Sequence, residues 1–295
     1  MSAKPNPPLP AGHRLPGYRL LKLIARGGFS FVYLAQDEAG AQVAIKEYAP
    51  SDAAGFGHGL KCFFEEGRAL ACLSHPNVVR VLNFFRANDT AYMVMRHESG
   101  GTLRQRLQQA GAPLAEGWLR RTFAQLLNGL REVHARKLLH LDIKPANVLL
   151  REDATPVLID FGASRRMACA DDAALRPVFT PGLAAPEVHS DRSKLGPWSD
   201  LYSIGATLYQ CMFVQPPPPA LERLGRDRCV PAREAGAGRY SAALLGLVDE
   251  CLRLDPLQRP QSVLGLQKAL LGPLPARLPE DPKARLRWIM GVGGQ

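Results

Sequence analysis

The chain lacks any long apolar run, which limits the kinds of protein it can be. No stretch of about 20 consecutive apolar residues, the length that spans a bilayer, occurs in the sequence. The longest candidate, Leu201 to Val214, is too short and has the composition of a buried helix. The first residues include a lysine but no apolar core of the kind found in secretory signals. We therefore expect a soluble protein without a membrane span that acts in the cytoplasm.

Cysteine is also scarce, and its spacing points to no metal site. The six cysteines are scattered, with no CxxC pair and no histidine at zinc-binding spacing. This excludes the common zinc motifs, and reduced structural thiols are the expected state. The net charge is +10, but the basic residues are dispersed and are not interleaved with aromatic residues. That distribution argues against binding to nucleic acid.

What the sequence does contain is a change of pattern at the glycine pair Gly100-Gly101. Before it, short runs rich in β-branched and aromatic residues predict strands, with one amphipathic helix over 63–73. After it, the patterns are mainly helical. The predicted fold is therefore α+β and bilobal, with a small antiparallel-sheet lobe carrying one helix and a larger, mainly helical lobe. The proline-rich residues 1–17 are expected to form a disordered lead-in, and residues 272–295 a C-terminal tail.

One apolar segment, LLHLDIKPANVLL at 138–150, carries an unusual set of polar residues: His140, Asp142, Lys144 and Asn147. Burying an unpaired charge is costly, so such residues are usually paired, bound to a metal or exposed in a cleft. The next apolar runs, VLL and PVLI, flank a polar turn and predict a β-hairpin. This hairpin would bring Asp160 back beside Asn147, and their oxygen atoms would suit a hard cation such as Mg²⁺. Taken singly, Asn147 fits a turn cap and Asp160 a surface acid equally well.

The segment HLDIKPANVLL, followed by DFG at 160–162, resembles the catalytic loop and metal-binding signature of eukaryotic-type (Hanks-type) serine/threonine protein kinases. Other landmarks of that family occur in the family's order: VAIK at 43–46, Glu66, TPGLAAPE at 180–187, Asp200 and Arg259. The sequence IKEY at 45–48 is similar to that of bacterial members. The likeness covers residues 18–271, with an N-terminal lobe at 18–95, a hinge at 96–101 and a C-terminal lobe at 102–271.

This resemblance implies transfer of the γ-phosphate of ATP, bound with Mg²⁺ between the lobes, to serine or threonine hydroxyls of protein substrates. Asp142 would accept the hydroxyl proton, and Lys144 would neutralise the γ-phosphate. Asn147 and Asp160 would hold Mg²⁺. The residues expected around ATP are Ile24, Ala25, Gly27, Gly28, Val32, Ala44, Lys46, Glu66, Met95, Arg96, His97, Glu98 and Leu149.

The resemblance also implies more specific roles. Lys46, held by Glu66, would fix the phosphates, and the main chain of residues 96–98 would bond the adenine edge. Met95 would be the gatekeeper next to that edge. Thr180 and Glu187 would belong to the substrate and activation segment. Structural roles would fall to Asp200, which anchors the catalytic loop, to Arg259, which pairs with Glu187, and to His140, which packs on Phe161.

The glycine-rich loop departs from the family pattern. Only Gly27 is in place, because Ala25 and Ser30 stand where the first and third glycines would be. Glycine in such a loop lets backbone N–H groups approach phosphate closely. Alanine and serine add little bulk, so we expect altered nucleotide affinity and not its loss.

Leu141 is a second departure, because arginine is common at its position and pairs with a phosphate on the activation segment. Between Gly162 and Glu187 the only hydroxyl residues are Ser164 and Thr180. The arginine and an obvious phosphate acceptor are thus missing together. We expect activity without phosphorylation of this segment, which Asp171 and Asp172 would help to order.

Two other functions remain open. A pseudokinase, acting as a nucleotide-binding regulatory module, would have lost one of four residues that are all present: Lys46, Asp142, Asn147 and Asp160. A small-molecule phosphotransferase of the aminoglycoside-kinase kind shares the HxDxxxxN spacing. The segment 180–187 and Arg259 favour a protein substrate. The sequence leaves the oligomeric state open.

Overall fold

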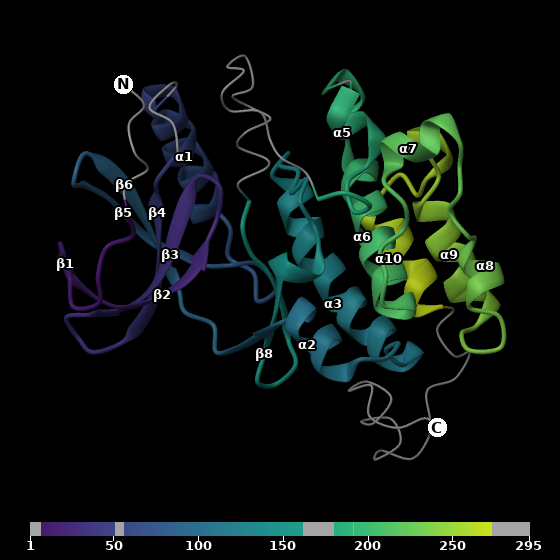
Figure 1. Ribbon diagram of the computed structural model, residues 1–295, viewed down its shortest axis with the longest axis horizontal. Helices are drawn as coiled ribbons and strands as arrows, with labels where there is room; N and C mark the ends of the chain where they lie inside the picture. The colour runs from purple at the N-terminus through teal and green to yellow at the C-terminus, as the bar shows by residue number, and fades with distance from the viewer. Residues whose placement is uncertain (1–6, 51–55, 162–179, 191, 273–295) are drawn as a thin grey trace.

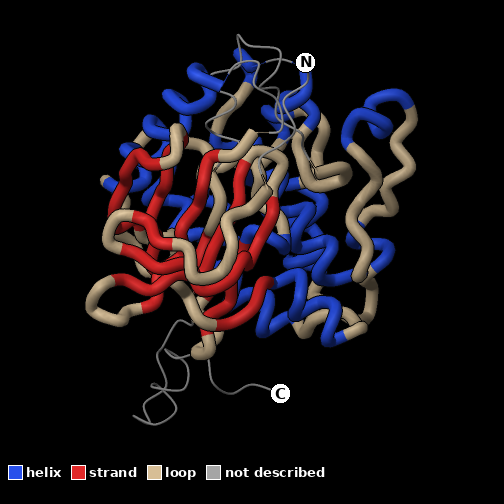
Figure 2. Tube along the Cα trace, turned by 60° about the vertical axis from the view of Figure 1, so that its left-hand side comes forward, coloured by secondary structure: helices blue, strands red, loops and turns tan. Residues whose placement is uncertain are grey.

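The structure is a computed structural model that describes residues 7–50, 56–161, 180–190 and 192–272. It has two lobes, as the sequence pattern predicts. The strands of the N-terminal lobe and their one helix lie at one end, and the helices of the C-terminal lobe lie at the other (Figure 1). Turning the molecule brings the sheet forward and shows the helices gathered behind and beside it (Figure 2). The predicted tail lies outside the described residues, apart from Gly272.

The N-terminal lobe is built on one antiparallel sheet with strand order β1-β2-β3-β4-β6-β5. Its strands are β1 (Arg14–Leu15), β2 (Tyr18–Arg26), β3 (Ser30–Asp37), β4 (Gln42–Tyr48), β5 (Val81–Ala87) and β6 (Thr90–Arg96). The helix α1 (Phe56–Ala71) packs against β5 and β6. It begins seven residues before the predicted start at Phe63, through a glycine-containing stretch that local propensity disfavours. Further along α1, a Cβ atom at Gly67 would lie 1.7 Å from the Phe84 ring, so glycine at this position lets the helix pack closely on β5.

The prediction of a disordered lead-in is wrong for residues 7–17. Strand β1 pairs with β2, Leu15 is buried, and the Leu9 N–H donates to the Tyr33 hydroxyl at 3.0 Å. This segment covers an apolar cluster on the face of the sheet that α1 leaves open, which includes Leu20 and Ile45. Proline-rich composition signals the absence of regular structure, but it cannot show that a sheet face elsewhere needs a cover.

The C-terminal lobe surrounds the long central helix α6, which is buried along nearly its whole length. Its strands are β7 (Gly100–Thr102), β8 (Val148–Arg151) and β9 (Pro156–Leu158), which form a second antiparallel sheet. Its helices are α2 (Leu103–Ala110), α3 (Glu116–Ala135), α5 (Pro186–Ser190), α6 (Pro197–Phe213), α7 (Ala220–Gly225), α8 (Ala232–Ala235), α9 (Ala242–Cys251) and α10 (Val263–Leu271). Short 3-10 turns occur at η1 (Pro145–Asn147), η3 (Arg192–Lys194) and η4 (Pro256–Gln258).

The cysteines differ in part from the expectation of reduced thiols. Among the residues that the structure describes, four cysteines are free: Cys72, Cys211, Cys229 and Cys251. Cys62, on α1, is disulfide-bonded. The spacing of cysteines along the chain carries no information about sulfur atoms that the fold brings together.

Among the described residues, no helix combines the length and the apolarity needed to cross a bilayer.

Candidate active site

A buried carboxylate on α6 organises the turn that carries Asp142. Asp200 is fully buried and accepts hydrogen bonds from the N–H groups of His140 at 2.9 Å and Leu141 at 2.7 Å. The His134 Nε2 lies 2.7 Å from the same carboxylate. Burial by itself raises the pKa of Asp200, but the hydrogen bond and charge of His134 and the N–H of His140 together lower it below its ordinary value. Asp200 therefore stays ionised, and its two hydrogen bonds hold the main chain at residues 140–141.

Leu141 lies in a strained backbone conformation. Its φ of +61° is in the left-handed region, which is unfavourable for a residue with a Cβ atom. The hydrogen bond to Asp200 holds this conformation. The Leu141 side chain is buried among apolar residues of the main core. Asp142 follows directly after this turn, and its side chain is 10 % exposed.

His140 links this turn to the residue after β9. Its Nδ1 accepts from the Asp142 N–H at 3.3 Å, so its Nε2 is the nitrogen that donates to the Ile159 carbonyl at 3.2 Å. Its ring lies 4.3 Å from the Phe161 ring, between centroids, so the packing predicted for this pair is present. His140 thus fixes the main chain at both Asp142 and Ile159, which flank η1 and the β8–β9 hairpin in the sequence.

Asp142 lies at the centre of a polar cluster. One carboxylate oxygen, Oδ2, accepts from Lys144 Nζ at 2.8 Å and from Asn147 Nδ2 at 2.9 Å. Lys144 Nζ also donates to the Thr180 hydroxyl at 3.1 Å, which brings in a segment 36 residues further along the chain. The Asn147 amide nitrogen donates a second time, to the Asp142 carbonyl at 2.9 Å. The two hydrogen bonds donated by Nδ2 therefore fix the orientation of the Asn147 amide. In this orientation its Oδ1 points away from Asp142.

The predicted hairpin is present and places Asp160 next to Asn147. Strands β8 and β9 pair in antiparallel register, and beyond their end the Ile159 N–H donates to the Asn147 carbonyl at 3.0 Å. Asp160 follows directly, with a φ of +61° and a side chain that is about half exposed (49 %). An amide oxygen and an exposed carboxylate on adjacent chain ends are hard donors, so these residues fit Mg²⁺ by their chemistry.

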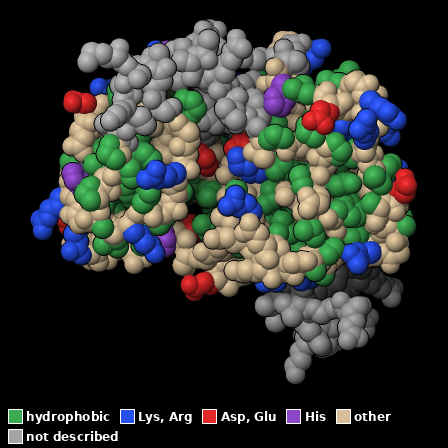
Figure 3. Space-filling view, viewed as in Figure 1, with side chains coloured by type: hydrophobic (Ala, Val, Ile, Leu, Met, Phe, Trp, Pro, Cys, Tyr) green, Lys and Arg blue, Asp and Glu red, His purple; other side chains and the backbone are tan. Residues whose placement is uncertain are grey.

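Lys46 joins the two lobes through two carboxylates. Its Nζ lies 2.8 Å from Asp160 Oδ1 in the C-terminal lobe and 3.4 Å from Glu66 Oε1 on α1. Lys46 and Glu66 are buried, whereas Asp160 is half exposed. Acidic and basic side chains are also seen close together where the two lobes meet (Figure 3). A buried ammonium held by a buried carboxylate, next to a solvent-facing one, suits an anionic ligand in the space between the lobes.

Most of the residues predicted to surround ATP lie on neighbouring strands of the N-terminal sheet, β2, β3, β4 and β6, or directly after them. Val32 pairs with both Ala25 and Lys46, and Ala44 pairs with Met95. Three of them, Val32, Ala44 and Leu149, are half-buried, as expected of apolar side chains that line a cleft. The others in this set are Ile24, Gly27, Gly28, Glu66, Arg96, His97 and Glu98. In the glycine-rich loop, the Gly27 N–H donates to the Ser30 carbonyl at 2.8 Å and closes the turn between β2 and β3.

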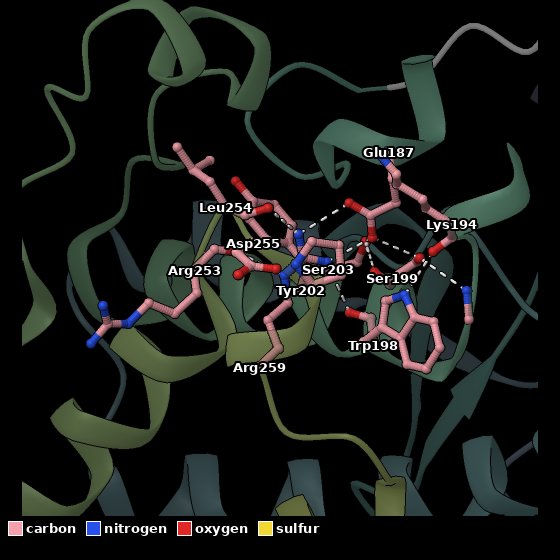
Figure 4. A network of polar contacts seen from close by, with 12 residues as sticks. Glu187, Lys194, Trp198, Ser199, Tyr202, Ser203, Arg253, Leu254, Asp255 and Arg259 are labelled. Atoms are coloured by element: carbon pink, nitrogen blue, oxygen red, sulfur yellow. Dashed lines mark hydrogen bonds and ion pairs between the residues drawn. The ribbon is translucent and has the colours of Figure 1, made fainter. Parts of the chain in front are cut away.

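A second buried ion pair stabilises the segment that follows Thr180 and leads into α5. Arg259 Nη1 and Nη2 lie 2.7 Å and 3.0 Å from the two oxygens of Glu187, so the predicted pairing is present. The Ser199 hydroxyl donates to Glu187 at 2.7 Å, and Arg259 also donates to the Leu254 carbonyl at 2.9 Å. Figure 4 shows these side chains pointing toward one another from α5, α6 and the end of η4.

Sequence reasoning missed two contributors to the site. His134 supports Asp200, although on α3 it reads as one more residue of an amphipathic helix. Arg151 bonds the side chain of Glu98 through two nitrogens, an ion pair that no local pattern indicates. Both pairs join residues distant in the chain, so only the packing of the elements brings them together.

Comparison with known proteins agrees with this geometry. A family model described as "Protein kinase domain" matches residues 18–271. The chain is 31% identical over 263 residues to the serine/threonine-protein kinase Nek3 of Mus musculus, covering 87% of this chain and 50% of that protein. It is 28% identical over 313 residues to the serine/threonine-protein kinase pkn3 of Myxococcus xanthus, covering 92% of this chain and 56% of that protein.

The solved structure described as "PpkA-294 apo form" superposes with a TM-score of 0.78 at 34% identity, covering 89% of this chain and 99% of that one. The chain spans about half the length of the curated relatives it matches. The match over nearly all the described residues shows the family. The chain belongs to the protein kinase family.

Proposed function

We propose that this chain is a serine/threonine protein kinase that transfers the γ-phosphate of ATP to serine and threonine hydroxyls of protein substrates. The observation that carries the proposal is the simultaneous presence of two networks. Lys46 is paired with Glu66 and Asp160, and Asp142 is bonded to Lys144 and Asn147. The first suits a nucleotide phosphate, and the second suits a hydroxyl that must lose a proton.

The two networks carry out different parts of the reaction. Lys46 binds phosphate oxygens and is kept in place by Glu66. Asn147 and Asp160 would hold Mg²⁺, which would offset the negative charge of the phosphates. Asp142 orients the substrate hydroxyl and accepts its proton as the new P–O bond forms and the bond to the β-phosphate oxygen breaks, releasing ADP. Lys144 neutralises charge on the phosphate that moves.

A serine or threonine acceptor is supported by the Lys144–Thr180 hydrogen bond of 3.1 Å. It places a positive charge and a threonine hydroxyl beside Asp142, in the arrangement that resembles serine/threonine-specific kinases. The buried Glu187–Arg259 pair stabilises the adjoining segment, which favours an extended protein substrate over a small molecule. Because ATP is supplied inside cells, we infer that the protein acts in the cytoplasm.

The experiment that tests this function combines ATP labelled in its γ-phosphate, Mg²⁺ and a general protein substrate with the purified chain. We expect phosphoserine and phosphothreonine in the acid hydrolysate. Asp142→Ala should lower transfer by about 100-fold or more, with an unchanged circular dichroism spectrum. Glu152→Ala removes an exposed acid from the β8–β9 turn and should leave transfer unchanged.

Three results would contradict the proposal. Phosphate transfer by Asp142→Ala at the wild-type rate would show that Asp142 takes no part in the reaction. ATP binding without any transfer by the wild-type chain would indicate a nucleotide-binding regulatory module. Transfer to an aminoglycoside but to no protein would indicate a small-molecule phosphotransferase.

We also propose that activity does not require phosphorylation of the activation segment. Leu141, at the position where arginine is common, is buried in apolar surroundings and supplies no cation to a phosphate. Asp171 and Asp172, expected to help order that segment, lie outside the described residues. Treatment of the purified kinase with a phosphatase, followed by its removal, should leave the initial rate unchanged. A rate that falls after treatment and returns on incubation with ATP would overturn this proposal.

A further inference from the structure

Arg151, the last residue of β8, joins three parts of the chain. Its Nε lies 2.5 Å from Glu98 Oε2, and its Nη2 lies 2.8 Å from Glu98 Oε1. Its Nη1 donates to the Pro76 carbonyl at 3.0 Å. The side chain of Glu98 is only 8 % exposed, so this two-point ion pair is largely shielded from water. A guanidinium bonded to both oxygens of a carboxylate fixes the position and the plane of its partner.

The Pro76 end of this arrangement is fixed to the C-terminal lobe. Asn77 Nδ2 donates to the Pro156 carbonyl at 2.7 Å, and the Leu158 N–H donates to the Asn77 carbonyl at 2.9 Å. The Val79 N–H donates back to the Leu158 carbonyl at 2.9 Å. The connection between α1 and β5 is therefore bonded along its length to the β8–β9 hairpin. Arg151 consequently ties Glu98 to a rigid junction.

Main-chain hydrogen bonds hold the two ends of the hinge, and the Arg151–Glu98 ion pair holds its middle. Strand β6 ends at Arg96, whose N–H donates to the Arg80 carbonyl at 2.9 Å. Strand β7 begins at Gly100, which pairs with Arg151. At Gly100 φ is +127° and a Cβ atom would lie 2.0 Å from the Leu150 carbonyl oxygen, so only glycine allows this close pairing. Residues 97–99 span the gap, and Glu98 is their midpoint.

We propose that Arg151 is a positioning residue for the nucleotide, which acts through Glu98 to hold the main chain of the hinge where it meets the adenine ring. This inference rests on the proposed function, in which the main chain at 96–98 bonds the adenine edge. Without the ion pair, the middle of the hinge would have to be ordered when the nucleotide binds, and that ordering would reduce affinity. The pair thus sets the affinity for adenosine and its phosphates, while Asp142 and Lys46 set the rate of transfer.

The test compares Arg151→Ala, Glu98→Ala and the double variant with the wild-type chain. We expect each single variant to raise the KM for ATP and the Kd for ADP by about ten-fold, with kcat changed by less than about two-fold. The double variant should show no further loss, because its two residues act through one interaction. Arg151→Lys keeps the charge but not the two-point geometry, so its loss should be intermediate. If Arg151→Ala fails to fold, the comparison is made with Arg151→Lys.

Arg136→Ala is the matched control. Arg136 is also an arginine of the C-terminal lobe that contacts a glutamate, Glu132 at 3.3 Å, and a main-chain carbonyl, that of Cys72 at 2.9 Å. It has no contact with the hinge in the described residues. A merely structural role for Arg151 would lower stability without changing nucleotide affinity, as expected of this control. That result for Arg151→Ala, or additive losses in the double variant, would overturn the proposal.

The choice of ligand separates the hinge from the phosphate site. Because Arg151 acts on the adenine side, its variants should weaken binding of adenosine, ADP and ATP by the same factor. Lys46→Ala should weaken binding of ATP more than that of adenosine, since Lys46 contacts phosphates. Loss of ATP affinity alone in Arg151→Ala would contradict a role at the hinge. Failure of the wild-type chain to bind any adenine nucleotide would instead reject the proposed function itself.

Discussion

Arg259 and Glu187 form a buried two-point ion pair across 72 residues of sequence, with both nitrogen–oxygen distances at or below 3.0 Å. The Arg259 guanidinium also lies 4.9 Å from the centroid of the Tyr202 ring. Three main-chain carbonyls accept its remaining N–H groups, those of Arg253, Leu254 and Trp198. One side chain therefore joins α5, α6 and the segment between α9 and η4.

We expect Arg259→Ala to lower the free energy of unfolding by about 3–5 kcal/mol, because it leaves the Glu187 carboxylate buried without a cation. Denaturant unfolding followed by circular dichroism measures the loss. Arg253→Ala is the control, since the Arg253 side chain is exposed and points away from the network (Figure 4). Equal losses in the two variants would show that the buried pair contributes nothing of its own.

Removing the charge of Glu66 tests the Lys46 network. In Glu66→Gln, Lys46 loses the charge of Glu66 but keeps its ion pair with Asp160. We expect Lys46 to be drawn toward Asp160 and away from the phosphates, which should lower kcat/KM by at least about ten-fold, or about 1.4 kcal/mol. Steady-state kinetics at several ATP concentrations measures this change. Glu65→Gln, an adjacent exposed glutamate, is the control, and an equal effect there would refute the assignment.

Ionisation of Asp200 should make the free energy of unfolding depend on pH under acidic conditions. Its pKa is lower in the folded chain than in the unfolded one, because hydrogen bonds from His134 and the main chain outweigh burial. Such a carboxyl contributes stability fully above its unfolded pKa, about 4, and loses it as the pH falls through the folded pKa. Asp200→Asn should therefore be less stable at neutral pH and should lose less stability below about pH 4. Parallel pH profiles for the two proteins would contradict this account.

The N-terminal segment, residues 7–17, is bonded to the sheet through the Tyr33 hydroxyl. The Tyr33 hydroxyl donates to the buried Glu47 at 2.6 Å and accepts from the Leu9 N–H, so it joins the segment to β4. Tyr33→Phe should cost about 1–3 kcal/mol of unfolding free energy, because the buried Glu47 carboxylate loses one of its two hydroxyl donors in the described part of the chain, Tyr33 and Tyr92. Thermal unfolding measures the loss. Tyr18→Phe, which removes an exposed hydroxyl, should cost much less, and a Tyr33→Phe variant as stable as the wild type would refute the link.

Local patterns in the sequence were sufficient for much of the active site. The hairpin that returns Asp160 to Asn147 follows from two short apolar runs around a polar turn. It involves residues close in the chain, where spacing and backbone preference decide the geometry. The departure at Leu141 is also visible in the sequence.

By itself, then, the sequence determined the two lobes and the hairpin, and it contained the residues that we propose for the phosphate and hydroxyl sites. Only the tertiary structure decided that Arg151 reaches Glu98, that His134 supports Asp200, and that residues 7–17 cover the sheet. Periodicity and turn chemistry are encoded within a few residues, so they can be read directly. Which distant side chains meet depends on how the faces of whole elements pack, because burial of apolar surface selects one arrangement of the chain and the polar pairs follow from it.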